Sequence, residues 1–167
     1  MTYAQIGSVS SGTLRPEDLI PAFCDCLDDL KQELALSVQP GDELETVQRC
    51  SQIDGLLSMI EQNQGDEGYY DSEEAQDDLG NLVEWLETFA APYCYFGSHE
   101  GDGADFGFWP SMDSLNEDLQ TAELLEVTDL SEVPDDFTGH IWHVNDHGNG
   151  ALYMADNGKL SEIWSIV

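Results

Sequence analysis

The chain has 167 residues, and its 35 Asp and Glu stand against only 4 Lys and Arg, which gives a formal net charge of −31 at pH 7. Proteins that bind nucleic acid or anionic lipid need clustered Lys and Arg, whereas Arg15, Lys31, Arg49 and Lys159 are scattered singly along this sequence. We therefore expect no direct binding to nucleic acid and no membrane contact. The 41% of apolar and 10% of aromatic residues are enough for a folded core and are unlike an acidic disordered tail.

The length predicts one domain, residues 1–167, because most domains have roughly 100 to 150 residues. Within it we expect a mainly helical part over 1–92 and a mainly β part over 93–167. The first residues lack the basic and apolar segments of a leader, and no apolar run approaches the roughly 18 residues that span a bilayer. These features predict a cytoplasmic protein.

Three amphipathic helices are expected in the first part. The first begins near Pro16 and ends before Pro40, the second runs over 42–63, and the third runs over 72–90 with Ser72 as its N-cap. Apolar residues recur at steps of three and four, as on one face of a helix. Those expected to face the core are Ile20, Phe23, Leu27, Leu30 and Leu34 in the first helix, Leu44, Val47, Leu57 and Ile60 in the second, and Leu79, Leu82, Val83, Leu86 and Phe89 in the third.

Short aromatic runs separated by Gly, Asp and Asn predict strands and turns in the second part. The expected strands are 93–97, 105–109, 124–127, 140–144, 151–155 and 163–167, with a loop over 98–104 and a short helix over 113–119. Two Asn-Gly pairs are strong hairpin signals, so we expect the last three strands to form an antiparallel meander. The predicted fold class is α+β, with N-terminal helices packed on a C-terminal antiparallel sheet.

Acidic residues recur at helical spacing on the faces opposite the apolar stripes. Like charges at such spacing lie about 5 to 6 Å apart and repel by a few tenths of a kcal/mol per pair, and a surface built only for solubility would interleave Lys. The candidate partner-binding residues are Asp18, Asp25, Asp29 and Glu33 in the first helix, Glu73, Asp77, Asp78, Glu84 and Glu87 in the third, and Glu100, Asp102 and Asp105 in the loop that follows.

Rows of carboxylates imitate the rows of phosphates in a nucleic acid. The expected partner is therefore a basic nucleic-acid-binding protein or complex with a groove lined by Lys and Arg, to which such rows would bind in a salt-sensitive manner. A merely solvated surface, or an acidic background shared by all proteins of the source cell, is the alternative explanation of the charge.

Motifs that carry chemistry are missing from the sequence. There is no G-x-S-x-G elbow and no phosphate-binding loop followed by a basic residue. His140, His143 and His147 lie close together, but strand alternation and a turn separate them, so we expect no metal site and no cofactor. The four cysteines form no C-x-x-C motif and are expected to be reduced thiols. We expect no catalytic residues.

In size, α+β character, near absence of Lys and Arg, and acid rows, the chain resembles the acidic DNA-mimic proteins of phages and mobile elements, the anti-CRISPR and anti-restriction proteins. The rows that carry the resemblance are Asp18/Asp25/Asp29/Glu33 and Glu73/Asp77/Glu84/Glu87. It is a resemblance of class, with no motif matched residue by residue, and the distinctive stretch Tyr95–Pro110 carries no assigned function. The resemblance implies a non-enzymatic inhibitor in the bacterial cytoplasm that occupies the DNA-binding groove of a CRISPR surveillance complex or a restriction enzyme.

Other functions stay open at this point. An immunity-type protein that neutralises a cationic toxin, such as a nuclease, would also be a small acidic α+β domain, and a small cytosolic enzyme is a third alternative. Trp109, Trp142 and Trp164 are either core side chains or a contact in a homodimer.

Overall fold

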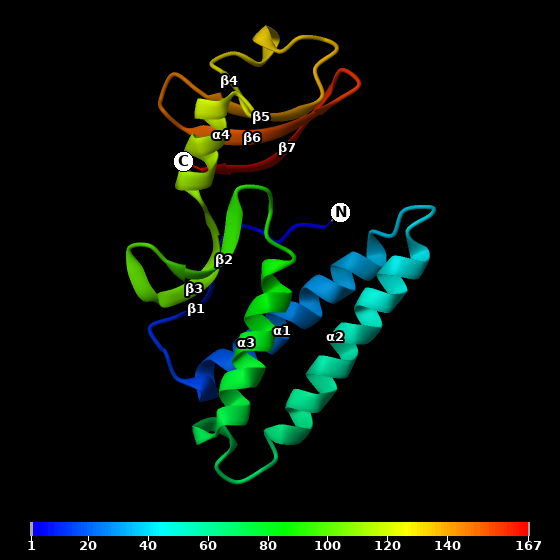
Figure 1. Ribbon diagram of the computed structural model, residues 1–167, viewed down its shortest axis with the longest axis vertical. Coiled ribbons are helices and arrows are strands. Elements are labelled where there is room, and N and C mark those ends of the chain that lie inside the picture. The colour runs from blue at the N-terminus through cyan, green and yellow to red at the C-terminus, as the bar shows by residue number, and fades with distance from the viewer. Residues whose placement is uncertain (1, 167) are drawn as a thin grey trace. The chain divides into compact units, whose positions relative to one another are not determined.

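The computed structural model describes residues 2–166. Its main elements, in chain order, are β1 (Gly7–Ser11), α1 (Pro16–Leu36), α2 (Glu43–Asn63), α3 (Glu73–Glu87), β2 (Cys94–His99), β3 (Asp102–Pro110), α4 (Met112–Thr121), β4 (Leu125–Val127), β5 (Gly139–Val144), β6 (Gly150–Asp156) and β7 (Lys159–Ile166) (Figure 1). The α+β fold class is confirmed, since three long helices precede a run of antiparallel strands.

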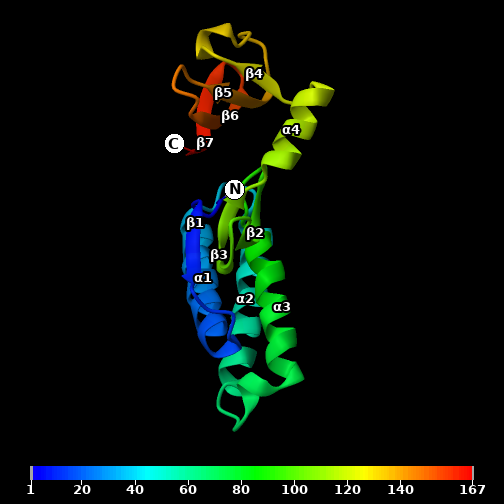
Figure 2. The same cartoon turned by 90° about the vertical axis from the view of Figure 1, so that its left-hand side faces the viewer.

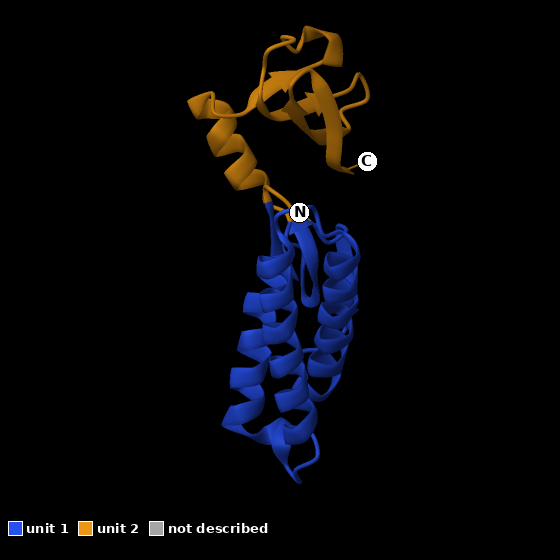
Figure 3. Cartoon of the chain, turned by 90° about the vertical axis from the view of Figure 1, so that its right-hand side faces the viewer, with its two compact units in different colours: residues 1–90, 94–109 blue, residues 91–93, 110–167 orange. Residues whose placement is uncertain are grey.

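The chain divides into two compact units (Figure 3). Unit 1 consists of Met1–Ala90 and Cys94–Trp109, and unit 2 consists of Ala91–Tyr93 and Pro110–Val167. The sequence suggested one domain with parts that meet at residue 92. In the structure the β2–β3 hairpin instead belongs to the helical unit, because its aromatic side chains pack into the core of the helices.

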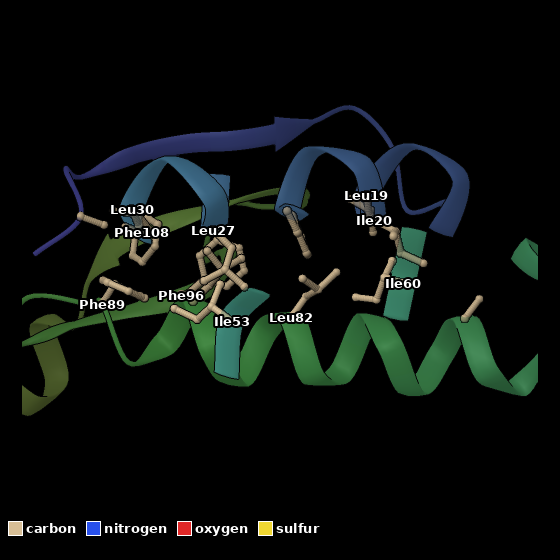
Figure 4. Close-up of a cluster of buried hydrophobic side chains, with 14 of the residues drawn as sticks. Leu19, Ile20, Leu27, Leu30, Ile53, Ile60, Leu82, Phe89, Phe96 and Phe108 are labelled. Carbon is tan, nitrogen blue, oxygen red and sulfur yellow. The ribbon is translucent and has the colours of Figure 1, made fainter. Parts of the chain in front are cut away.

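The core of unit 1 is built on α1, which packs against both α2 and α3. The predicted stripe of α1 is confirmed at its centre, where Ile20, Phe23 and Leu27 are fully buried. Figure 4 shows these helices meeting across a continuous layer of apolar side chains, which includes Leu19, Ile20, Leu27 and Leu30 of α1, Ile53 and Ile60 of α2, and Leu82 of α3.

The packing face of α2 differs from the prediction. Leu44 and Val47 were expected to face the core, but they are exposed, and Thr46, Ile53 and Ile60 are the buried residues. Because these three residues recur at steps of seven, α2 contributes one core side chain for every two turns. This narrow contact line leaves Leu44, Val47 and Met59 exposed, whereas Leu57, also predicted to face the core, is half-buried against it.

A three-stranded sheet completes unit 1, with the strand order β1-β3-β2 (Figure 2). Phe96 of β2 and Phe108 of β3 are buried, with ring centroids 4.9 Å apart, and the ring of Phe23 meets that of Phe96 edge-on at 5.0 Å. The turn between β2 and β3 is shorter than the predicted loop over 98–104, since β2 ends at His99 and β3 begins at Asp102. Strand β1 was not predicted.

Gly107 lets β1 approach β3 closely. It lies opposite Ser8 in the β1–β3 ladder, and a Cβ atom at position 107 would come within 2.1 Å of the carbonyl oxygen of Gly7. No side chain is tolerated at such a distance, so this glycine is required for the pairing.

Unit 2 contains a four-stranded sheet with the order β4-β5-β6-β7. The meander of β5, β6 and β7 is antiparallel, as predicted, whereas β4 joins it as a parallel edge strand. Trp142 and Trp164 are buried with ring centroids 5.5 Å apart, and the indole nitrogen of Trp164 donates a hydrogen bond to the carbonyl of Pro92. These two tryptophans are core residues.

No helix over residues 2–166 combines the length and the apolar character needed to cross a bilayer.

Candidate partner-binding surface

The acid row of α1 lies on the side of the helix opposite the core. Asp25, Asp29 and Glu33 are all exposed, and within residues 2–166 none of their carboxylates forms a hydrogen bond or an ion pair. Their spacing of four residues places one carboxylate about every 6 Å along the helix axis. A strand of duplex DNA carries one phosphate about every 3.4 Å along the axis, so the row has about half that linear charge density.

Asp18, the first member of the row, is neutralised locally. Its carboxylate accepts a hydrogen bond of 2.7 Å from the Thr13 hydroxyl, and the Arg15 side chain lies 3.8 Å away. Arg15 also pairs with Glu17. Asp18 therefore belongs to the N-terminal end of α1 rather than to the unpaired row.

Two grooves flank the row. Asp29 and Glu33 line a groove of about 490 Å³ between α1 and β1. Asp25 lines a second groove, of about 450 Å³, between α1 and α2, where Asp28 and Glu61 lie beside it. Asp28 and Glu61 were missed by the sequence analysis, and only the pairing of the two helices reveals them.

The acid row of α3 is also exposed, with one exception. Glu73, Asp77 and Glu84 lie on the outer face without a hydrogen bond or ion pair in the described part of the chain. Asp78 was expected in this row, and that prediction is wrong, since it is 2% exposed. The sequence carries one signal of this burial, because Asp78 lies at helical spacing from the buried residues Ala75, Leu82 and Leu86.

The two rows face in different directions. The apolar faces of α1 and α3 contribute to the same core, and in Figure 4 their side chains meet between the two helices. Each acid row lies on the far side of its own helix, so one flat partner surface would contact one row and not both.

Three of the four remaining predicted residues form hydrogen bonds within the fold. The carboxylate of Glu87 accepts a hydrogen bond of 2.5 Å from the backbone N–H of Phe96 and thereby joins α3 to β2. Asp102 accepts one from the N–H of Ala104, and Asp105 accepts one from the Ser8 hydroxyl. Glu100, at the hairpin turn, is exposed and lies outside both helical rows.

The basic side chains of unit 1 are engaged inside it. Lys31 donates to Asp28 at 2.5 Å and to Asp54 at 2.6 Å, which ties α1 to α2. Arg49 donates to the carbonyl and hydroxyl of Thr88 and lies 4.4 Å above the Phe89 ring, which ties α2 to the end of α3. These cations stabilise helix packing and leave the outer acid rows uncompensated.

Three cysteine thiols are disfavoured as nucleophiles by their surroundings. Burial, with a contribution from neighbouring carboxylates, raises the pKa of Cys24 and Cys26 to about 11 and that of Cys94 to about 12, so these thiols stay protonated at neutral pH. Within residues 2–166 no group of three or more His, Cys, Asp or Glu side chains is placed to hold a metal ion.

Comparison of the chain with protein-family models, curated proteins and solved structures found no match.

Proposed function

We propose that this protein is a non-enzymatic inhibitor that acts in the bacterial cytoplasm as a DNA mimic and occupies the basic DNA-binding groove of a host defence complex. The α1 row, defined here as Asp25, Asp29 and Glu33, is the surface that contacts the Lys and Arg side chains of that groove. The activity of this complex depends on DNA binding, as in a CRISPR surveillance complex or a restriction enzyme.

One observation carries the proposal: the α1 row presents three carboxylates that form no hydrogen bond or ion pair within residues 2–166, on a helix that is anchored in the core by the fully buried Ile20, Phe23 and Leu27. A helix packed in this way holds its charges at fixed spacing, so little conformational entropy is lost on binding. The repulsion within the row costs some stability, which a partner's cations would recover.

The test is competition with DNA. Purified surveillance complexes and restriction enzymes are mixed with a labelled DNA target, and the protein is expected to displace the DNA in a stoichiometric and salt-sensitive manner. The triple variant Asp25→Lys/Asp29→Lys/Glu33→Lys is expected to bind roughly 10- to 100-fold more weakly, since each reversed surface charge costs about 0.5 to 1 kcal/mol.

A matched control comes from α3. The variant Glu73→Lys/Asp77→Lys/Glu84→Lys changes the net charge by the same amount on a different face and is expected to inhibit like the parent protein. Equal loss in both variants would mean that total charge, not the α1 row, controls binding. An immunity protein would instead be supported by two results together. Every complex would still bind DNA fully at a saturating concentration of this protein, and the protein would protect cells against a basic nuclease toxin.

A further inference from the structure

The three most exposed large apolar side chains of the described chain all lie at one end of the α1–α2 hairpin. Leu36 is 88% exposed, Leu44 71% and Val47 64%. Leu36 is the last residue of α1, and the other two lie in the first turns of α2, on either side of the loop that joins the helices (Figure 1). We call these three residues the apolar tip.

Leu36, the residue that α1 contributes to the apolar tip, continues the α1 row. Leu36 follows Glu33 by three residues and Asp29 by seven, so these side chains share one face of the helix. A partner that contacts Asp29 and Glu33 along α1 would therefore reach Leu36 at the end of the same row.

The charges around the tip decide which partner fits it. Glu33, Asp42, Glu43 and Glu45 are exposed beside the tip, and no Lys or Arg occurs over 32–48. The nearby Lys31 is held by two carboxylates. A second copy of this chain would bring acidic rim against acidic rim, whereas a surface with apolar residues inside a basic rim would complement both features.

We propose that the apolar tip is a docking anchor that enters an apolar depression at the rim of the partner's basic groove. This inference rests on the proposed function and adds to it a contact that DNA cannot make, because DNA carries no branched aliphatic side chain. The acid row then supplies the salt-sensitive part of the affinity, and the tip supplies a part that salt does not screen.

Two helical peptides of equal positive charge serve as probes, one with a Leu stripe beside its Lys residues and one with Gln at the Leu positions. Their binding to the full chain is measured by calorimetry at low and high NaCl. We expect the Leu peptide to bind about tenfold more tightly and to keep this advantage at high salt. The variant Leu36→Ser/Leu44→Ser/Val47→Ser is expected to abolish the advantage.

The matched control is Leu14→Ser/Met59→Ser/Met112→Ser, which changes three exposed apolar residues elsewhere. This variant is expected to keep the tighter binding of the Leu peptide. Thermal melts confirm that both variants fold. Either of two results in the peptide assay would overturn the proposal: equal affinity for the two peptides, or equal loss in both variants. It would also be overturned if the tip caused self-association in sedimentation or binding to phosphatidylcholine vesicles. The peptide assay uses no defence complex, so its failure would overturn the docking anchor and leave the proposed function standing. A failure to displace DNA would overturn the proposed function, and with it the groove to which the tip is assigned.

Discussion

The carboxylate of Asp78 is buried and forms hydrogen bonds within the fold, unlike those of the exposed acid rows. It accepts hydrogen bonds from the Tyr69 hydroxyl at 2.8 Å and from the Asn63 side-chain amide at 3.0 Å. Burial, and the hydrogen bond to Asp78, raise the pKa of the Tyr69 hydroxyl, which therefore remains a donor at every physiological pH. The three residues join the end of α2, the turn at Tyr69–Asp71 and α3.

Replacing Asp78 should therefore destabilise unit 1 even though it removes a negative charge from a strongly acidic protein. We expect Asp78→Ala to lower the free energy of unfolding by about 1 to 3 kcal/mol, because the buried hydroxyl of Tyr69 loses its acceptor. Urea unfolding measures the change. Asp77→Ala removes the same charge from an exposed neighbour, and a loss as large in that variant would contradict the explanation.

His140 introduces a pH dependence into unit 2. Its ring packs edge-on against Tyr93 with centroids 5.7 Å apart, and its Nε2 is buried without a hydrogen-bond partner among residues 2–166. Burial lowers the pKa of His140, and nearby Asp118, which accepts a hydrogen bond from Tyr93, opposes this only in part. The unfolded chain thus takes up a proton more readily than the folded chain, so stability falls as the pH drops below about 6.5.

The variant His140→Phe should flatten this dependence, because it retains an aromatic ring beside Tyr93 and removes the titrating group. We expect the difference in unfolding free energy between parent and variant to shift in favour of the variant as the pH is lowered from 7 to 5, as followed by Trp fluorescence in urea. The exposed His147 is the control, and His147→Phe should follow the parent protein. A pH-independent difference for His140→Phe would contradict the assignment.

At the scale of elements, the helices were predictable from the sequence, but the elements against which they pack were not. The spacing in α1 and α3 identified both core faces, because each buries a broad apolar stripe. The single line of buried residues on α2 misled the same reasoning about Leu44 and Val47. Strand β1 escaped prediction because Gly7–Ser11 contains one apolar residue, Val9, and its pairing with β3 joins segments about a hundred residues apart.

The exposed acid rows were predictable for the same reason as the helices, since a residue opposite an apolar stripe faces solvent. What the sequence could not reveal is which carboxylates the fold itself occupies. The hydrogen bonds of Glu87 to Phe96 and of Asp105 to Ser8 depend on contacts between elements that helical spacing does not encode.

The pairing of β1 with β3 should be sensitive to a single methyl group. We expect Gly107→Ala to displace β1 and to destabilise unit 1 by about 1 to 3 kcal/mol, because its Cβ would overlap the backbone of Gly7. Gly103→Ala, in the same strand, is the matched control, since a Cβ there has open space around it. Hydrogen exchange should show faster exchange of the β1 amides in the first variant only, and equal exchange rates in both variants would contradict the packing argument.

For the whole molecule, the net charge of −31 makes folding into a compact state electrostatically unfavourable. Self-repulsion among 35 acidic residues destabilises a compact chain more than an expanded one, and salt screens it over about 10 Å at 0.1 M. We expect the melting temperature to rise with added NaCl and to rise less in the Lys-substituted triple variants of α1 and α3. A melting temperature that salt does not move would show that the charges are farther apart than the helical rows indicate.

The scarcity of basic residues also makes this protein unusually simple to label. Only two lysine side chains occur in the sequence, and Lys31 is 17% exposed with its amine held by Asp28 and Asp54. Lys159, at the start of β7, is exposed. Of the two lysine side chains, an amine-reactive dye should therefore modify that of Lys159, in unit 2, in preference to that of Lys31, and it leaves the carboxylates of the acid rows chemically intact.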